Sequence, residues 1–376
     1  MKKKILSGLL AAVMVISLCA PTAFAAAGMS NFKPDKIYAN NFKDVAVKDW
    51  YHENVKSAYE YGFMVGIGNG TFGPNANLKI IEAVVMADRI YSVYNYGSCD
   101  IPLGDDVWYS EYVDFAVKNR IIRDGDFENY DAYATRAETA YIFGNALPSR
   151  EFDTLNSVTE LPDVARGGKY SDDILNFVRS GISIGIDRYG TFGPDELVSR
   201  AQAAAFSTRL AVKSLRLTFI QYKTMSAADG IITFDVPTRF VKYTYNQYPG
   251  MEFIQDPSTN TIVSVDKSAL DVAGFQIDNL FTADAIKELY IKNLTDEKSG
   301  TTVTSCTSQK IAFGVIHAYK SNIVTKNSGT TFYHTAYIFI SGSNVYEFSV
   351  SGDTNGAMMS TIAGSVKVGG FAAKAI

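Results

Sequence analysis

The chain has 376 residues, of which 47% are hydrophobic and 20% are charged. This length accommodates two domains with their own cores, and the hydrophobic content excludes a globally disordered chain. The formal net charge is −4 at pH 7, which argues against nucleic-acid binding because phosphate neutralisation needs clustered lysine and arginine.

Residues 1–25 have the pattern of a secretory signal peptide. Lys2-Lys3-Lys4 form a basic start, an apolar segment runs from Ile5 to Leu18, and Ala23-Phe24-Ala25 is a cleavage site of the small-x-small type. Cleavage would leave 32 basic and 39 acidic side chains, a net charge of −7. No later run reaches the length of a membrane span. The sequence therefore predicts an exported, mildly acidic protein.

After an extended lead-in over residues 26–40, apolar stripes at helical spacing predict three helical hairpins. Such helix pairs pack on one another, and three of them can share one core. A polar connector, residues 148–162, precedes the third hairpin. The stripes are Val55, Ala58, Tyr59 with Val84, Ala87, Ile90, Tyr91; Tyr112, Phe115, Ala116 with Ala140, Ile142, Phe143; and Ile174, Phe177, Val178 with Ala201, Ala205, Phe206.

A capping box marks the start of the second helix in two hairpins. The boxes are Thr135-Arg136-Ala137-Glu138 and Ser199-Arg200-Ala201-Gln202, and Lys79-Ile80-Ile81-Glu82 is a degenerate copy. In such a box the hydroxyl accepts from a backbone N–H while the Glu or Gln reaches back to the cap. Arg136 and Arg200 are thereby placed near the positive end of a helix dipole, which suits an anion. The alternative for each is an ordinary solvated arginine.

The boxes belong to a longer repeat. Glu82, Glu138 and Gln202 are 56 and 64 residues apart, and the loop Gly-Thr-Phe-Gly-Pro occurs at 70–74 and again at 190–194. Self-similarity at such a period indicates units that cannot bury their apolar faces alone. Each unit also opens in a similar way, with Asp44 and Trp50 in the first, Trp108 in the second, and Asp163 in the third.

These features together resemble the S-layer homology (SLH) repeat, with copies over residues 41–97, 98–147 and 161–210. The resemblance implies a mostly α-helical, pseudo-threefold module that binds polysaccharides of the bacterial wall, often acidic ones with pyruvate ketals. It also implies a secreted protein that is held non-covalently at the cell surface by the secondary cell-wall polymer.

The resemblance also suggests the binding residues, which would line grooves between repeats. They are Arg136, Arg200, Trp50, Trp108, Lys79, Asp44 and Asp163. The alternatives are purely structural roles, in which each Trp anchors the core and each Asp caps backbone amides. Ile80 replaces the first box arginine, Lys169 falls where a third Trp would be, and repeat 2 lacks the Phe-Gly-Pro loop, so at least one groove is expected to be altered.

The second half has a different texture, with a linker expected over residues 211–229 and an α+β domain with an antiparallel sheet over 230–369. The expected elements are strands at 231–236, 253–254 and 262–265, a helix from Thr282 to Asn293, a meander over 310–323, 332–340 and 344–350 with a turn at Ser341-Gly342-Ser343, and a helix over 357–366. This order of elements loosely resembles the PsbP-like (Mog1/PsbP) fold.

The sequence favours binding without catalysis, and we expect no cofactor. Its three histidines, His52, His317 and His334, lack a recognisable nucleophile motif, and no pair of carboxylates stands out as a glycosidase would need. Cys99 and Cys306 are expected to be unpaired and suggest no metal site. The second half would be a binding or assembly module; the alternative is an anchored wall hydrolase with an unrecognised site.

Overall fold

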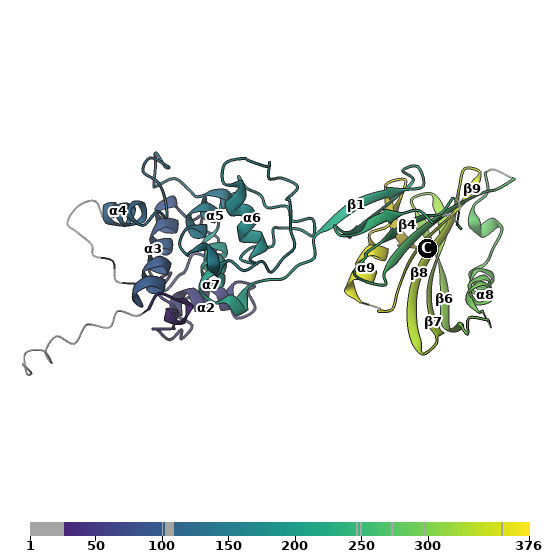
Figure 1. The fold of residues 1–376 in the computed structure, drawn as a ribbon, viewed down its shortest axis with the longest axis horizontal. Coiled ribbons are helices and arrows are strands. Elements are labelled where there is room, and N and C mark those ends of the chain that lie inside the picture. The colour runs from purple at the N-terminus through teal and green to yellow at the C-terminus, as the bar shows by residue number, and fades with distance from the viewer. Residues whose placement is uncertain are drawn as a thin grey trace, which may run out of the picture. The chain divides into compact units, whose positions relative to one another are not determined.

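The protein divides into two compact units between Phe219 and Ile220 in a computed structural model. The structure describes residues 26–376 except 100, 102–108, 246, 249, 272–273, 297 and 355. The expected signal peptide and Trp108 lie outside the described residues. The first unit is built from helices and the second mainly from strands (Figure 1).

The first unit contains the three expected hairpins, and most residues of their apolar stripes belong to or pack against one buried cluster. Its helices are η1 (Met29–Asn31), α2 (His52–Glu60), α3 (Ile80–Tyr96), α4 (Ser110–Lys118), α5 (Arg136–Gly144), η2 (Ser149–Glu151), α6 (Ser171–Arg179), α7 (Arg200–Ala211) and η3 (Lys213–Leu215). Each second helix begins at its predicted box. None of the helices in the described part of the chain has the length and hydropathy to span a bilayer.

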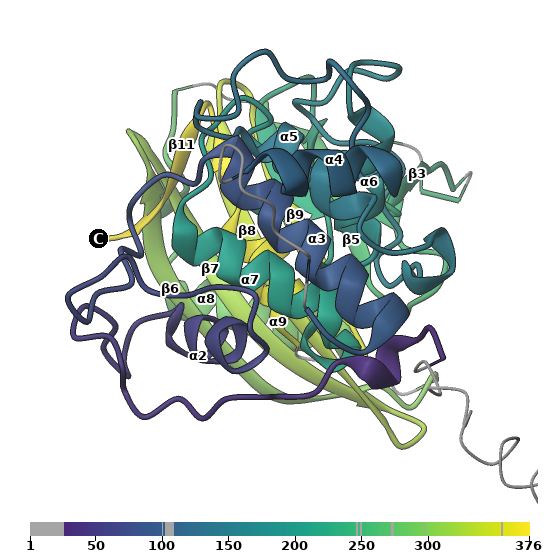
Figure 2. The same ribbon diagram turned by 90° about the vertical axis from the view of Figure 1, so that its left-hand side faces the viewer.

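The helices pack in a cyclic order. The first helix of each hairpin packs on the second helix of the hairpin before it, so α4 lies against α3 and α6 against α5. The first hairpin follows the same rule by placing α2 against α7, the second helix of the last hairpin. Figure 2 shows α3 and α4 side by side. This order joins the two ends of the helical unit.

A ring of three backbone hydrogen bonds lies just before the second helices. Leu78 N donates to Val198 O at 2.8 Å, Val198 N donates to Ala134 O at 3.0 Å, and Ala134 N donates to Leu78 O at 2.8 Å. All three side chains are completely buried. In each hairpin the equivalent residue therefore donates one backbone hydrogen bond and accepts another.

The second unit is an antiparallel sheet with two α-helices among its described residues. The sheet order is β1-β2-β10-β11-β6-β7-β8-β9-β5-β4-β3. The elements are β1 (Tyr222–Ala227), β2 (Ile232–Pro237), β3 (Val241–Tyr243), β4 (Glu252–Gln255), β5 (Ile262–Ala269), η4 (Ile277–Asn279), α8 (Ala283–Leu294), β6 (Thr302–Phe313), β7 (Ile316–Asn327), β8 (Thr330–Ser341), β9 (Asn344–Gly352), α9 (Ala357–Gly364), β10 (Lys367–Val368) and β11 (Phe371–Ala375).

This sheet is strongly curled. Phe234 on β2 and Phe348 on β9 come from strands far apart in the sheet order, yet their rings lie 4.9 Å apart. Helix α9 packs on both strands and fills the inner side. Helix α8 covers part of the other face, where Ile286 and Tyr290 pack against Ile323. Strand β8 is buried at five successive residues, as packing on both faces requires, whereas β9 alternates between buried and half-buried positions.

The sequence-based prediction of this unit needs two corrections. The segment expected as one strand over residues 310–323 is divided by a turn at Gly314, whose φ of +61° suits glycine, so it contributes to both β6 and β7. The expected linker, residues 211–229, contains strand β1, which pairs with β2 in register from Tyr222–Pro237 to Ala227–Ile232. The short strands β10 and β11 carry no period-two pattern and were not expected.

Candidate functional site

The second helix of each hairpin begins against a loop of another hairpin. In α5, Arg136 N donates to Glu196 O at 2.8 Å and Ala137 N to Pro194 O at 3.0 Å. The equivalent bonds in α7 and α3 are Arg200 N to Ala76 O, Ala201 N to Pro74 O, Ile80 N to Ala132 O and Ile81 N to Tyr130 O. The capping boxes use the next amides, since Glu138 N donates to Thr135 Oγ1. The helix amides that we expected to attract an anion are therefore already satisfied.

Arg136 extends from α5 into the third hairpin and is only 3% exposed. Its Nε donates to Phe192 O at 2.6 Å, and its Nη2 donates to Ser183 Oγ at 3.4 Å. Its guanidinium also stacks over the rings of Phe192, at 4.7 Å, and Phe206, at 5.6 Å. Burial lowers the pKa of Arg136 below its ordinary value. The alternative of a solvated arginine is wrong at this position.

Arg200 makes the matching contact from α7 to the first hairpin and is 6% exposed. Its Nε donates to Phe72 O at 2.9 Å and its Nη2 to Val65 O at 2.7 Å. Its Nη1 forms an ion pair with Glu82 Oε1 at 3.0 Å. Burial lowers the pKa of Arg200, while Glu82 acts in the opposite direction. The arginines of the two boxes thus join neighbouring hairpins through buried contacts.

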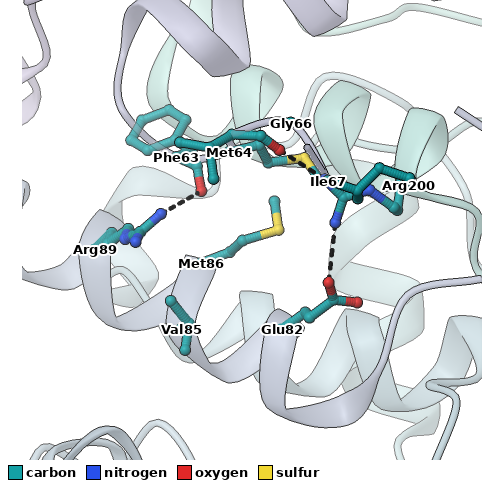
Figure 3. A pocket seen from close by; sticks show the side chains of 10 residues that line it. Phe63, Met64, Gly66, Ile67, Glu82, Val85, Met86, Arg89 and Arg200 are labelled. Carbon is teal, nitrogen blue, oxygen red and sulfur yellow. Dashed lines mark hydrogen bonds and ion pairs between the residues drawn. The ribbon is translucent and has the colours of Figure 1, made fainter. Parts of the chain in front are cut away.

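A pocket of about 290 Å³ lies where Arg200 meets the first hairpin. Its lining combines two guanidinium groups, one carboxylate and an apolar surface that includes both Met64 and Met86. Figure 3 shows Arg89 on one side of the pocket and Arg200 with Glu82 on the other. A concave, mostly apolar site with a few polar groups is the usual form of a small-molecule site.

Sequence reasoning missed Arg89. Its Nη1 donates to Phe63 O at 3.1 Å and to Gly62 O at 3.4 Å, at the end of α2. The available signal was spacing, because Arg89 follows Glu82 by seven residues and so lies on the same face of α3 two turns later. Arg209 has the same spacing from Gln202 in α7.

Asp44 and Asp163 support the two Phe-Gly-Pro loops. The carboxylate of Asp44 accepts from Phe72 N and Gly73 N, both at 2.8 Å. Asp163 accepts from Phe192 N and Gly193 N at 2.8 and 2.7 Å. Burial raises the pKa of Asp44, but the hydrogen bonds from these amides lower it by more, so the pKa of Asp44 lies below its ordinary value. Both aspartates therefore cap backbone amides, which is the alternative role that the sequence suggested for them.

The other expected binding residues lie at the surface. Trp50 is 63% exposed and meets Tyr51 edge-on at 5.4 Å, so a role as core anchor is wrong for it. Lys79 precedes α3 and forms an ion pair with Asp131 of the second hairpin at 2.8 Å. Neither residue lines the pocket at Arg200. The structure thus brings Arg200 together with Glu82 and Arg89, while Trp50 and Lys79 lie elsewhere.

Among the residues of the second unit that the structure describes, neither histidine has both a hydroxyl and a carboxylate as hydrogen-bond partners. His334 contacts Ser351 Oγ at 2.7 Å and Thr325 Oγ1 at 3.0 Å, and burial lowers its pKa. His317 contacts Asp278 at 2.9 Å. Within the described part of the chain no cluster of side chains has the composition of a metal site, and both Cys99 and Cys306 are free thiols.

The class defined by this geometry is a module of helical hairpins that are joined through buried arginines, with a pocket beside one of these arginines. Residues 41–79 and 161–204 match the S-layer homology domain. The N-terminal half of this chain therefore carries S-layer homology sequence; the expected middle repeat, residues 98–147, is not part of the match.

Curated relatives agree with this family. An S-layer protein of Bacillus licheniformis is 27% identical over 209 residues, which is 54% of this chain and 22% of that protein. S-layer protein EA1 of Bacillus anthracis is 26% identical over the same length, with the same coverage. This chain thus spans about a fifth of the length of these relatives.

Solved structures with some likeness cover about two fifths of this chain. Cyanobacterial PsbP from Synechocystis has a TM-score of 0.32 at 15% identity, with 39% of this chain and 92% of that chain covered. The Ran-binding protein Mog1p of Saccharomyces cerevisiae has a TM-score of 0.27 at 11% identity, with coverage of 40% and 96%. These are the two folds that the sequence of the second half loosely resembles; at such scores they carry no functional argument.

Proposed function

We propose that residues 41–210 form a pseudo-threefold S-layer homology module that anchors this protein non-covalently to an acidic polysaccharide of the bacterial wall. The observation that carries the proposal is the buried arginine contact between hairpins, which occurs twice and has a pocket beside it at Arg200. The ring of backbone bonds and the cyclic helix packing support a threefold arrangement. The S-layer homology matches support the wall polymer as the ligand.

The module would hold the protein at the cell surface after export. A groove that combines guanidinium groups with methionine side chains suits a sugar that has both an acidic group and an apolar face, because charge-assisted hydrogen bonds are the strong ones. Pyruvate ketals offer both features. Several grooves that engage one polymer would gain avidity over a single groove.

The second unit, from residue 220 onward, would be the part that the module displays, with a role in binding or assembly and no catalysis. Two observations support this role. Among the described residues His334 contacts only hydroxyls and the side-chain contact of His317 is with Asp278, and the curated relatives are S-layer proteins by name.

Co-sedimentation of the full chain with purified wall sacculi tests the anchoring proposal. Sacculi would be used intact and after acid removal of their secondary polymer. We expect the protein to pellet with intact sacculi and to remain in solution with stripped ones. Equal pelleting with both would refute the secondary polymer as the ligand, and no pelleting with either would refute anchoring.

A further inference from the structure

One face of the sheet in the second unit is partly open to solvent between helix α8 and the end strand β3. Along β9, Phe348 is buried on the inner side, whereas Ser349 and Ser351 point to the other face and are half-buried. Helix α8 covers this same face farther along the sheet, because Ile338 beneath it pairs with Glu347 of β9. Since α8 packs mainly on β6 and β7, the part of the face over β9, β5 and β4 stays accessible. Figure 1 shows α8 and α9 on different sides of the sheet.

An aromatic cluster borders this face at the end strand. Tyr243 and Tyr245 are each 37% exposed, and Tyr248 is 50% exposed. The rings of Tyr245 and Tyr248 lie 4.9 and 5.8 Å from the ring of Phe253 on β4, which pairs with Tyr243. Aromatic side chains that gather at the surface in this way are typical of an interaction site.

The strand register continues the aromatic cluster into a row of serines. Phe253 pairs with Ser264 of β5, which in turn pairs with Ser349 of β9. Directly paired residues point to the same face, and three strand spacings correspond to about 14 Å. We call this row and its neighbour the open face; they consist of Tyr243, Phe253, Ser264 and Ser349, and of Val241, Gln255, Ile262 and Ser351.

Polar groups of the open face retain hydrogen-bonding capacity. Ser264 Oγ and Ser349 Oγ lie 2.8 Å apart, and the hydroxyl that accepts in this pair still has its own hydrogen to donate. Gln255 Oε1 accepts from Tyr245 Oη at 3.1 Å, while the NH₂ group of Gln255 has no partner among the described residues. The open face thus offers donors and acceptors directly beside aromatic rings.

The open face has no charged side chain among its eight residues. His334, whose ring contacts Ser351 Oγ at 2.7 Å, is buried, which lowers its pKa and favours its neutral form. In the next row Asp266 pairs with Glu347, and both are acidic. A negatively charged ligand would find no cation here and two carboxyl groups nearby, so the surface is complementary to an uncharged ligand.

The edge of β3 is itself poorly suited to pairing with a further strand. Strand β3 has only three residues, and Lys242 at its centre forms an ion pair with Glu252 of β4. Short edge strands that carry a lysine are typical of sheet edges that resist strand addition. A ligand is therefore expected to lie across the open face and not along its edge.

We propose that the open face binds an uncharged glycan chain, with sugar rings stacked on the aromatic cluster and sugar hydroxyls bonded to the serine and glutamine side chains. A pyranose ring has an apolar C–H face and a rim of hydroxyls, and a tyrosine supplies a large, rigid contact with a polar tip. The inference deepens the proposed binding role of the second unit and does not depend on the anchoring by the first.

Native gel electrophoresis of the full chain tests this proposal, with soluble, uncharged hydroxyethylcellulose or glycol chitin in the gel. A single face lacks the avidity of several sites on one polymer, and gel retardation detects such binding without sedimentation. We expect the polysaccharide to slow the protein. Tyr243→Ala should raise the apparent dissociation constant about tenfold, and Tyr243→Phe should retain binding. Tyr133→Ala, which removes a 54% exposed tyrosine of the first unit, is the matched control and should bind normally.

The proposal is overturned if neither polysaccharide slows the unchanged protein, or if Tyr243→Ala is slowed equally. Should Tyr243→Ala lower the melting temperature, Ser264→Val removes a hydroxyl with a residue that favours strands; we expect several-fold weaker binding, and unaltered binding would refute the site. Migration that slows with protein concentration in plain gels, and recovers in Tyr243→Ala, would make a second copy the occupant instead. These gels contain no acidic wall polymer, so none of these results bears on the sedimentation test of anchoring.

Discussion

Arg200 and Glu82 are 118 residues apart in the chain and form an ion pair of 3.0 Å between the last and the first hairpin. The same guanidinium donates to two backbone carbonyls of the first hairpin and stacks on Phe72 at 5.0 Å. A side chain with this many partners fixes the geometry of the groove before any ligand arrives. The pair is therefore a structural element as well as part of the lining of the pocket.

Replacement of Arg200 by alanine should destabilise the first unit. The change leaves Glu82 without its partner and removes bonds to Phe72 O and Val65 O, so we expect the free energy of unfolding to fall by about 3 kcal/mol. Arg200→Lys should recover only part of this loss, because an ammonium cannot reproduce the fork of a guanidinium. Urea denaturation of the full chain measures both, and a loss below about 1 kcal/mol for Arg200→Ala contradicts the structural role.

Asp88 should make the protein less stable as the pH rises. This side chain of α3 is completely buried, its oxygens have no hydrogen-bond partner among the described residues, and burial raises its pKa to about 9. The unfolded chain releases this proton near pH 4. Stability is therefore full below pH 4 and declines up to pH 9, by about 1.4 kcal/mol per unit at most.

Asp88→Asn removes this titration while it keeps the shape of the side chain. We expect its stability to depend less on pH between 5 and 9 and to exceed that of the unchanged protein at pH 8. Thermal or urea unfolding across this pH range provides the measurement. Parallel pH profiles for the two proteins would show that the carboxyl is ionised or solvated in the folded state.

Two glycines of the helical unit should respond in opposite ways to alanine. Gly185 has a φ of +78°, and a Cβ there would lie 2.6 Å from Thr191 O, so we expect Gly185→Ala to cost more than about 2 kcal/mol. Gly144 ends α5, and its Cβ would meet nothing closer than Asp173 Oδ1 at 3.7 Å. Gly144→Ala should be neutral or stabilise by up to about 1 kcal/mol. Equal unfolding curves for both variants would contradict the close approach at Gly185.

Trp50 should matter to binding and little to stability. Because it is 63% exposed, we expect Trp50→Ala to change the free energy of unfolding by less than about 0.5 kcal/mol. If its indole contacts the wall polymer, sedimentation with intact sacculi should fall by several fold. Unaltered sedimentation would remove Trp50 from the binding surface, and a large loss of stability would show a packing role that its exposure does not suggest.

The helices of the first unit could be predicted because their signals are local. Thr135 with Glu138 and Ser199 with Gln202 each specify a helix start within four residues, and the structure begins α5 and α7 at those boxes. The burial of Arg136 and Arg200 could not be read in this way. It depends on Phe192 and Phe72, which are supplied by loops 56 and 128 residues away, and a sequence does not state which loop meets which helix.

The second unit shows the same division between local and distant information. Thr282 caps α8 as its residue type suggested, with Ala285 N donating to its hydroxyl. Strands β10 and β11 were missed because they are short and, apart from pairing with each other, are held by β2 and β6, more than fifty residues away. Gly314 was missed as a turn because apolar residues continue on both sides of it.

The ring of Leu78, Ala134 and Val198 has a consequence for how such a chain can evolve. Open arrays of repeats grow or shrink by whole units, since each unit contacts only its neighbours. Here the last hairpin donates a hydrogen bond to the second and accepts one from the first. An added or deleted copy would therefore leave a buried donor and a buried acceptor without partners. Copy number is fixed by closure, whereas the order of the hairpins is not: a gene that starts at the second hairpin and ends with the first could encode the same ring.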